Sequence, residues 1–381
     1  MLDGVRWVVD GRGGVPNRSM GQITRTHSIA NERDAGSPDT NGPPSGKNGH
    51  AAPGTDVETE LRALHRDGEL DLPLPGGGET ANRHRRLFEL ARRHSVSVAR
   101  LAEAHTDAVA ILHEAGHQPA PGALYGVWAS VAPHQPVAPL RGELRRSASG
   151  GVRLSADKPF ASGLGIVDRA LVTATCDAIE PVDPAQFSHV GSSMLVDVDV
   201  SDAPTVSPHL EGWRTEALRG SATGSISFEN HPVSPDDVLG SPNWYLDRAG
   251  FWHGACGPAA CWAGAAVGLV DAAERITDDD PHRRAHLGAL RADAWALAAV
   301  LRAAGDEIDD DPADVERATA RALSLRQTVE RLVADILDRF GRSLGPRPFV
   351  GDAEVSQRWS DTYLYIRQHH AERDLERLGR G

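Results

Sequence analysis

The pattern of apolar and polar residues divides the chain into three regions with different predicted secondary structure. Between Val57 and Gly116 the pattern is helical, and Pro73, Pro75 and Gly76–Gly78 mark a loop between helices. Six apolar residues near the end of this region recur at spacings close to three and four and share one helix face: Val98, Leu101, Ala108, Ile111, Leu112 and Ala115. The region is therefore predicted to consist of packed helices that end at Gly116.

The second region, about 121–240, has the pattern of short strands. Leu171–Thr175 and Gly224–Phe228 are β-prone runs bounded by Gly, Pro, Ser and Asp. Three valines at 196, 198 and 200 alternate with two aspartates, the period of a half-buried strand. Since no long helix alternates with these strands, a doubly wound parallel sheet is not expected, and a compact antiparallel sheet or barrel is predicted.

Beyond Tyr245 the helical pattern returns in four stretches, at about 252–276, 283–304, 311–340 and 354–376. Short connections between them predict an antiparallel four-helix bundle. The predicted fold is therefore α+β and mostly α: an N-terminal helical domain (55–120), a small antiparallel β domain (121–240) and a C-terminal four-helix bundle (241–381). Residues 1–54 are predicted to be a disordered tail, because 37–54 are crowded with small and polar residues.

Charge and cysteine content narrow the classes of function. The net charge of −13 argues against nucleic-acid binding, which needs clustered basic residues. The basic residues are mostly arginines among acids on helical stretches, which is typical of solvated faces with local ion pairs. Three cysteines, Cys176, Cys256 and Cys261, form no CxxC motif and predict no disulfide framework, which favours a cytoplasmic protein without a secretory signal.

The most apolar run, Gly254–Val270, is 17 residues long and contains Pro258. A membrane span needs about 20 strongly apolar residues, so the run is interpreted as a buried bundle helix. Gly264 and Gly268 within it indicate close helix packing.

A metal-binding motif of the form HExxH occurs at His113, Glu114 and His117. On a helix this spacing places both histidines on one face as zinc ligands, with the glutamate as a base. Gly116 lies inside the motif and Pro119 follows it, so the second histidine is expected at or beyond the helix end, and no metal site is predicted.

Six further segments occur in an informative order. They are Leu124–Ser130, Gly142–Gly163, Leu218–Gly224, Tyr245–Gly254, Arg284–Gly288 and a C-terminal stretch, Arg358–Gly379. In this order they resemble segments of the acyl-CoA dehydrogenase family, and the resemblance covers roughly residues 80–379. The usual Thr-Glu-Pro segment is replaced by Trp-Ala-Ser at 128–130, as in divergent and monooxygenase-like branches.

The resemblance implies a flavoprotein that holds FAD between the β domain and the bundle, usually as a homodimer or homotetramer. It implies acyl-CoA or a similar small molecule as substrate, and an electron-transfer acceptor. Carried over by position, the expected cofactor-binding residues are Trp128, Ser130, Phe160, Ser162, Arg219, Ser221, Thr223 and Arg284.

The catalytic base is not apparent in the sequence. The Tyr-Glu-Gly segment that supplies the family's glutamate is missing, and His369, His370 and Glu372 on the predicted last helix are the candidates for a base. Dehydrogenation of an acyl thioester with another base, oxygen chemistry as in related flavin monooxygenases, and a catalytically inactive flavin-binding or ligand-binding protein all remain open. A helical binding protein without flavin is the non-enzymatic alternative.

Overall fold

The structure is a computed structural model that describes residues 55–130, 142–146, 152–176, 193–201, 204–276 and 279–380. The segment predicted to be a disordered tail, 1–54, lies outside the described residues.

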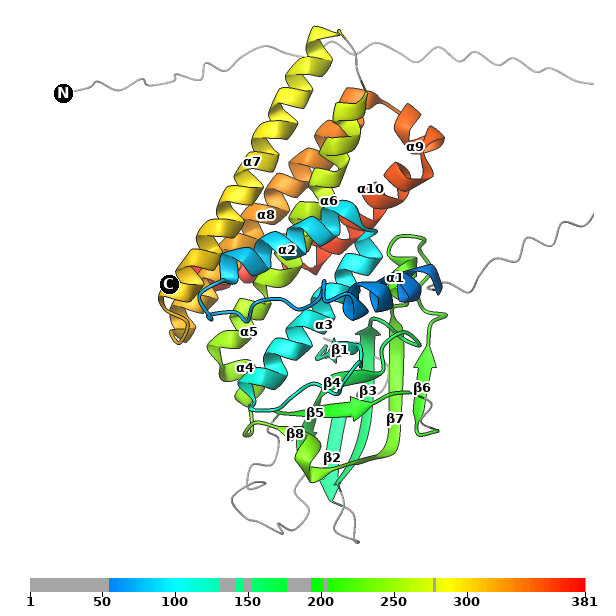
Figure 1. Cartoon of the computed structure of the whole chain (residues 1–381), viewed down its shortest axis with the longest axis vertical. Helices are drawn as coiled ribbons and strands as arrows, with labels where there is room; N and C mark the ends of the chain where they lie inside the picture. The colour runs from blue at the N-terminus through cyan, green and yellow to red at the C-terminus, as the bar shows by residue number, and fades with distance from the viewer. Residues whose placement is uncertain are drawn as a thin grey trace, which may run out of the picture. The chain divides into compact units, whose positions relative to one another are not determined.

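Three helices begin the described chain, as predicted: α1 (Thr55–Arg66), α2 (Thr80–Arg93) and α3 (Val96–Glu114). Ser95 separates the last two, because its hydroxyl accepts a hydrogen bond from the backbone N–H of Val98 at 3.2 Å and caps α3. In Figure 1, α3 runs from the helical bundle to the sheet. One face of α3 is therefore available to a site between these two parts.

The middle of the chain forms an eight-stranded sheet with the strand order β6-β7-β3-β2-β4-β5-β8, and β1 pairs with β4. The strands are β1 (Tyr125–Trp128), β2 (Gly142–Arg146), β3 (Val152–Ala161), β4 (Arg169–Cys176), β5 (Ser193–Asp199), β6 (Val206–His209), β7 (Gly224–Val233) and β8 (Val238–Leu239). The three predicted strands correspond to β4, β5 and β7. The antiparallel β domain is confirmed for most pairings, whereas β4 pairs in parallel with β1 and β2.

The predicted alternation in β5 is only partly observed. Val196 and Val198 are buried, but Asp197 between them is buried as well. The side chain of Asp197 accepts hydrogen bonds from Arg169 Nε at 2.9 Å and from the Tyr125 hydroxyl at 3.3 Å. The ion pair with Arg169 on β4 therefore stabilises the charged Asp197 on the other face of β5, which is also buried.

The C-terminal region is a helical bundle, as predicted. After the short helices α4 (Trp244–Asp247) and α5 (Ala249–Gly254), its long helices are α6 (Cys256–Arg275), α7 (Pro281–Asp310), α8 (Val315–Leu344) and α10 (Ala353–Tyr365), and α9 (Arg347–Gly351) joins the last two. The stretch Ala249–Arg275 is the one candidate membrane span among the described residues, and 83% of its most apolar window is buried inside the protein. Trp262 in α6 is fully buried. The prediction of a buried bundle helix is confirmed.

The prediction of one continuous last helix is wrong. After α10 the chain makes a 3-10 turn (Ile366–Gln368), leaves the helix at His369, and starts α11 (Glu372–Gly379). Ala371 has a φ of 49°, in the left-handed region, so the helix cannot continue through it. The break redirects α11 toward the cavity described below.

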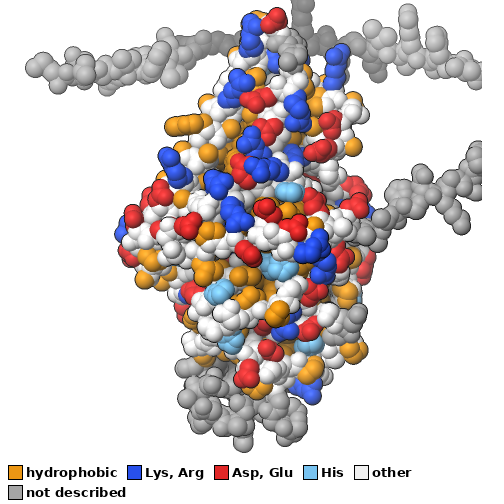
Figure 2. Space-filling view, in the orientation of Figure 1, with side chains coloured by type: hydrophobic (Ala, Val, Ile, Leu, Met, Phe, Trp, Pro, Cys, Tyr) orange, Lys and Arg blue, Asp and Glu red, His pale blue; other side chains and the backbone are white. Residues whose placement is uncertain are grey.

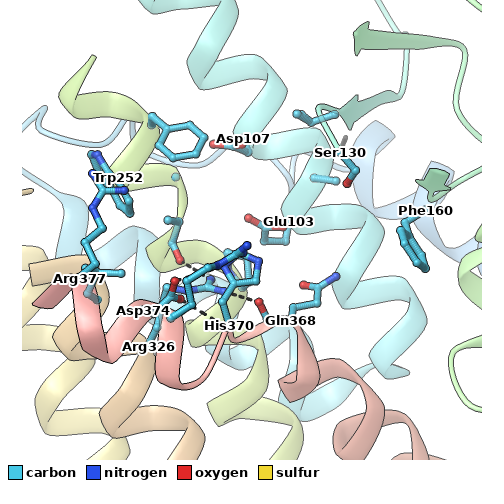
Figure 3. A pocket seen from close by; sticks show the side chains of 18 of the residues that line it. Glu103, Asp107, Ser130, Phe160, Trp252, Arg326, Gln368, His370, Asp374 and Arg377 are labelled. Atoms are coloured by element: carbon cyan, nitrogen blue, oxygen red, sulfur yellow. Dashed lines mark hydrogen bonds and ion pairs between the residues drawn. The ribbon is translucent and has the colours of Figure 1, made fainter. Parts of the chain in front are cut away.

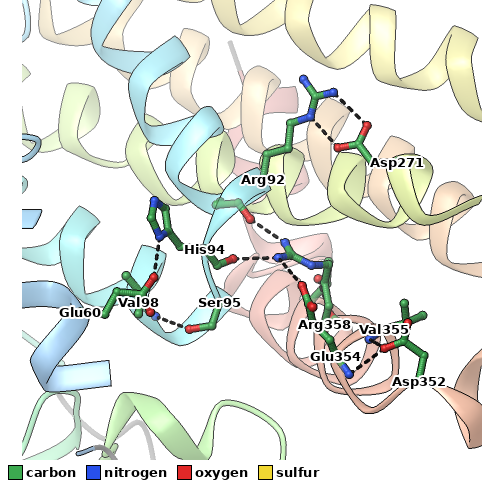
Figure 4. A network of polar contacts seen from close by, with 12 residues as sticks. Glu60, Arg92, His94, Ser95, Val98, Asp271, Asp352, Glu354, Val355 and Arg358 are labelled. Carbon is green, nitrogen blue, oxygen red and sulfur yellow. Dashed lines mark hydrogen bonds and ion pairs between the residues drawn. The ribbon is translucent and has the colours of Figure 1, made fainter. Parts of the chain in front are cut away.

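Two arginines, the buried Arg358 and the partly exposed Arg92, join the N-terminal helices to the bundle (Figure 4). Arg358 on α10 donates to the backbone carbonyls of Ala91 and His94, at 2.7 and 2.8 Å, where α2 ends. Arg92 on α2 makes a two-pronged ion pair with Asp271 on α6, at 2.7 and 2.9 Å. Since the last carbonyls of a helix have no partner within it, Arg358 acts as a C-terminal cap supplied by another helix.

Replacing Arg358 by methionine is expected to lower the free energy of unfolding by about 2–3 kcal/mol, because two carbonyls lose charged donors in a buried place. The exposed arginine of the Arg342–Asp338 pair provides the control. Its replacement by methionine should change the free energy by less than about 0.5 kcal/mol. Urea unfolding of both variants measures the difference, and equal effects would contradict the capping role.

The face of the molecule in Figure 2 carries acidic and basic side chains interspersed over the helices. Ion pairs within one helix include Arg342–Asp338 and Arg339–Asp335 on α8. The predicted solvated faces with local ion pairs are therefore found for these residues.

Candidate functional site

A cavity of about 750 Å³ lies where α3, the ends of β1 and β3, the α5–α6 junction, α8 and the segment from α10 to α11 meet. Figure 3 shows side chains from these elements pointing toward a common space. Its volume is within the range of small-molecule sites. The cavity is therefore the candidate active site.

Linked hydroxyl groups form the wall of the cavity on the sheet side. The Ser162 hydroxyl accepts hydrogen bonds from Arg100 Nε and Nη2, at 3.1 and 2.9 Å, and donates to the Thr223 hydroxyl at 2.9 Å. Thr223 is linked in turn to Ser221 at 2.8 Å, and Ser221 donates to the carbonyl of Leu218 at 2.7 Å. These bonds use the proton and both lone pairs of the Ser162 hydroxyl, so the network makes this wall of the cavity rigid.

Phe160 is an exposed aromatic side chain at the same wall. It is 64% exposed and has a φ of 55°, beside an irregularity in the β3–β7 pairing between Lys158 and Ala161. Bulges next to sites redirect side chains, and left-handed backbone in a bulky residue is typical of functional positions. The ring of Phe160 is thereby available for stacking in the cavity.

The cofactor-binding residues expected from the sequence fall into three groups. Ser130, Phe160 and Ser162 line the cavity. Trp128, Ser221 and Thr223 are buried directly behind it, and Trp128 Nε1 donates to the carbonyl of Ser162 at 3.0 Å. The last group, two arginines, does not line the cavity.

Arg219 pairs with Glu216 at 2.7 Å on the surface, and Arg284 pairs with Asp279 at 3.1 Å. Arg284 belongs to the first turns of α7, at the end of the bundle that is far from the sheet in Figure 1. The structure of one chain therefore does not bring either arginine to the cavity.

The three candidate bases lie around the break between α10 and α11, and not on one helix. His370 lines the cavity, but its side chain is exposed and Nδ1 lies 3.3 Å from Asp374 Oδ1. His369 is buried; its Nδ1 accepts from the Ala371 N–H at 3.1 Å, and burial lowers its pKa. Glu372 is exposed and is not a lining residue. Of the three, only His370 reaches the cavity.

Charged residues that were not predicted line the opposite wall. Arg100, Glu103 and Asp107 lie on one face of α3, and Arg326 comes from α8. The Arg326 side chain donates to the carbonyls of Ala255 and Gln368, both at 2.9 Å. In the sequence, the spacing of the three α3 residues indicates only a polar helix face, which usually faces water.

Glu103 is the most strongly perturbed of these acids. Burial raises its pKa to about 8, and the neighbouring Asp107 carboxyl group adds to the rise, against the opposing effect of Arg83, Arg100 and Arg326. Burial also raises the pKa of Asp107, against the effect of Arg248 and Arg83. At neutral pH Glu103 therefore holds a proton in the cavity wall, and perturbed acids of this kind are typical of functional sites.

Replacing Glu103 by glutamine is expected to stabilise the protein increasingly as the pH rises from 4.5, the ordinary value for glutamate, to about 8. In this range the unfolded chain has released the proton that the folded chain retains, so the stability of the native protein falls relative to the variant. Thermal unfolding of both proteins across this range measures the effect. A difference that does not change with pH would show that Glu103 ionises normally.

The HExxH motif does not form a metal site in the part of the chain that the structure describes. Helix α3 ends at Glu114, and Gly116 has a φ of 80°, so His117 lies beyond the helix. The carboxylate of Glu114 forms an ion pair with Arg248. The motif therefore marks the end of α3, and its glutamate links this helix to Arg248, directly after α4.

Comparisons with known proteins identify the fold. No protein-family model matches the chain, and no curated protein matches it. Several solved structures are similar over most of their length. FMN-bound TdsC from Paenibacillus sp. A11-2, a dibenzothiophene monooxygenase, is 17% identical with a TM-score of 0.65, covering 86% of this chain and 95% of TdsC.

KijD3 in complex with FMN and dTDP-3-amino-2,3,6-trideoxy-4-keto-3-methyl-D-glucose is 18% identical, with a TM-score of 0.68 and 84% of each chain covered. The nitrososynthase from Micromonospora carbonacea var. africana is 20% identical, with a TM-score of 0.66, covering 85% of this chain and 93% of that enzyme. The described chain thus has the acyl-CoA dehydrogenase-like fold expected from its sequence, and it shares this fold with flavin-dependent enzymes.

Proposed function

We propose that this protein is a flavin-dependent monooxygenase that acts on a small molecule in the cavity between the sheet and the bundle. The proposal is supported by the fold, which TdsC and KijD3 share in structures with bound FMN. FMN is the proposed cofactor, in place of the FAD that the sequence resemblance implies. A reduced flavin supplies the electrons that activate oxygen, and the protein supplies binding and electrostatics.

The cavity has groups that fit a flavin ring. The exposed ring of Phe160 offers a stacking surface, and the hydroxyl of Ser130 offers a hydrogen bond at the ring edge. Arg100 fixes Ser162 and brings a positive charge to the same place. In the proposal these residues hold the flavin, while Trp128, Ser221 and Thr223 support Ser162 from behind.

The single observation that favours oxygenation over dehydrogenation is the state of Glu103. Removal of an α-proton from a thioester needs an unprotonated base at the working pH. Glu103 lines the cavity and burial raises its pKa to about 8, so without a bound cation it retains its proton near neutral pH. A carboxyl group in this state is poorly suited to remove a proton from the α-carbon of a thioester.

Dehydrogenation of an acyl thioester is the second candidate, and one observation favours it. Arg373 and Arg377 on one face of α11, and Arg380 directly after this helix, line the cavity. Arginines bind phosphate groups through two parallel hydrogen bonds, so this face suits the phosphates of a CoA carrier.

Flavin titration and reaction with substrates test the proposal. The purified protein is titrated with FMN and with FAD, and binding is expected for FMN from the quenching of flavin fluorescence. Anaerobic addition of a series of acyl-CoA thioesters should leave the oxidised flavin unbleached. Bleaching by a thioester would establish the dehydrogenase, and failure to bind either flavin would leave a binding protein without cofactor.

The homodimer or homotetramer and the cytoplasmic location expected from the sequence belong to the same proposal. Sedimentation equilibrium of the flavin-loaded protein tests the assembly. A monomer that binds flavin fully would show that no second copy is needed for the site.

A further inference from the structure

Two carboxyl groups that point into the cavity have no direct partner among the described residues. Glu103 and Asp107 lie one turn apart on α3, and Figure 3 shows both directed toward the cavity. Side chains four positions apart on a helix are neighbours. Among the described residues, neither carboxyl group has a hydrogen bond or a close ion pair, and their charge interactions are all longer-range.

The nearby arginines are bound to other groups. Arg100 donates to Ser162, and Arg326 donates to two backbone carbonyls. Arg248 forms its ion pair with Glu114. These guanidinium groups lower the energy of a negative charge on the pair, but they do not supply hydrogen-bond donors to its oxygens. The carboxyl oxygens therefore remain open to hydrogen-bond donors from a ligand in the cavity.

Two glycines place the carboxyl groups against the α5–α6 junction. A Cβ atom at Gly254 would collide with Asp107 Oδ1, and one at Gly257 would collide with Glu103 Oε1. The junction therefore packs directly against both acids and restricts their positions. Such close packing organises the pair before a ligand arrives.

Aromatic side chains line the cavity close to the acids. Phe251 lies between Tyr245 and Trp252, with ring centroids 5.5 and 5.2 Å away and nearly perpendicular rings. All three line the cavity. Acids beside aromatic rings are suited to a ligand with a cationic group on an apolar body.

We propose that Glu103 and Asp107 bind the protonated amine of the substrate, and that Tyr245, Phe251 and Trp252 contact its apolar part. The substrate class is therefore a small organic amine with a ring or a short apolar chain. This inference rests on the proposed function, since it names the substrate of the same cavity.

Calorimetric titration with phenethylamine and 2-phenylethanol, two probes of similar shape that differ in charge, tests the inference. Both are titrated into the FMN-loaded protein and into the flavin-free protein. The amine is expected to bind at least about tenfold more tightly, equivalent to about 1.4 kcal/mol. The double variant Glu103→Gln, Asp107→Asn should lose this preference. Asp271→Asn, outside the cavity, should retain it.

Proton release provides a second readout on the unchanged protein. Since Glu103 has a pKa of about 8, binding of the cation near pH 7 should release a proton from it. The heat of binding, measured in two buffers that differ in ionisation enthalpy, shows whether this proton is released. Amine affinity should rise from about pH 6 to about pH 9 as the pair ionises. Seven titratable or charged side chains interact electrostatically with the pair: Arg83, Arg100, Tyr245, Arg248, Cys261, Arg326 and Tyr365.

Equal affinity for the amine and the alcohol would overturn the inference, as would a preference that survives in the double variant. If the double variant does not fold, as judged by circular dichroism, the pH series on the native protein decides, and an affinity that does not rise with pH rejects the amine site. If flavin does not bind, the proposed function is wrong, but the amine site can still be tested, because the amine is also titrated into the flavin-free protein.

Discussion

Alanine in place of Gly264 is expected to lower the free energy of unfolding by about 1–3 kcal/mol, the usual cost of overpacking a core. Gly264 lies in α6, where a Cβ atom would collide with the backbone carbonyl oxygen of Phe88 in α2. A backbone atom within a helix cannot rotate away as a side chain can. The two helices must therefore separate, and the contact of α6 with α2 is one of the main contacts of the core.

Gly288 provides the matched control for this prediction. It lies inside α7, and a Cβ atom there would meet no atom within 4 Å. Alanine at this position should raise the free energy of unfolding by about 0.5–1 kcal/mol, because glycine loses more backbone entropy in a helix. Urea unfolding of both variants gives the comparison. If Gly264→Ala lowers the free energy of unfolding no more than Gly288→Ala does, α6 and α2 are not in close contact at Gly264.

Methionine in place of Arg100 is expected to lower the two-electron potential of the bound flavin by at least about 30 mV, the equivalent of a tenfold change in the ratio of affinities for the reduced and oxidised forms. Arg100 holds the Ser162 hydroxyl with two hydrogen bonds, and its guanidinium lies over the Tyr365 ring at 5.3 Å. Reduced flavin carries more negative charge, so the loss of a buried cation beside it weakens binding of the reduced form most.

Arg219→Met is the control for the effect on potential. Arg219 was expected from the sequence to contact the cofactor, but its side chain pairs with Glu216 on the surface. Its replacement should leave the flavin potential unchanged. Photoreduction of the FMN-loaded variants beside a reference dye measures both values. A potential that shifts equally in the two variants would place Arg100 outside the flavin site.

The segments with one dominant apolar face were predictable from sequence. In α3 the apolar positions Val98, Leu101, Ala108, Ile111 and Leu112 are all buried in the structure. The glycine pair in α6 was also interpreted correctly, since Gly264 packs on α2 and Gly268 packs against Arg358. These patterns depend on local periodicity, which a sequence contains directly.

The buried arginines were not predictable in the same way. Arg83, Arg326 and Arg358 are less than a tenth exposed, although their sequence context is typical of solvated faces. Each is buried by helices distant in sequence and satisfied largely by backbone carbonyls, as with Arg358 at the end of α2. A carbonyl partner has no side-chain signature, so charge patterning could not identify it.

One wall of the candidate site was predictable from the sequence and the other was not. The resemblance rests on short segments that contain Ser130, Phe160 and Ser162, and all three residues line the cavity. Glu103 and Asp107 lie on a helix that the sequence analysis used only for its apolar face. They line the same cavity because α5 and α8 cover them.

By itself, the sequence determined the order of helices, sheet and bundle, because each depends on periodicities and turn residues within one segment. It also singled out Ser130, Phe160 and Ser162, which line the cavity on the sheet side. The tertiary structure alone decided that the last helix breaks at Ala371, that Arg219 and Arg284 lie away from the cavity, and that burial raises the pKa of Glu103. These features depend on burial and on charges brought together from distant segments, and burial exists only once the chain is folded.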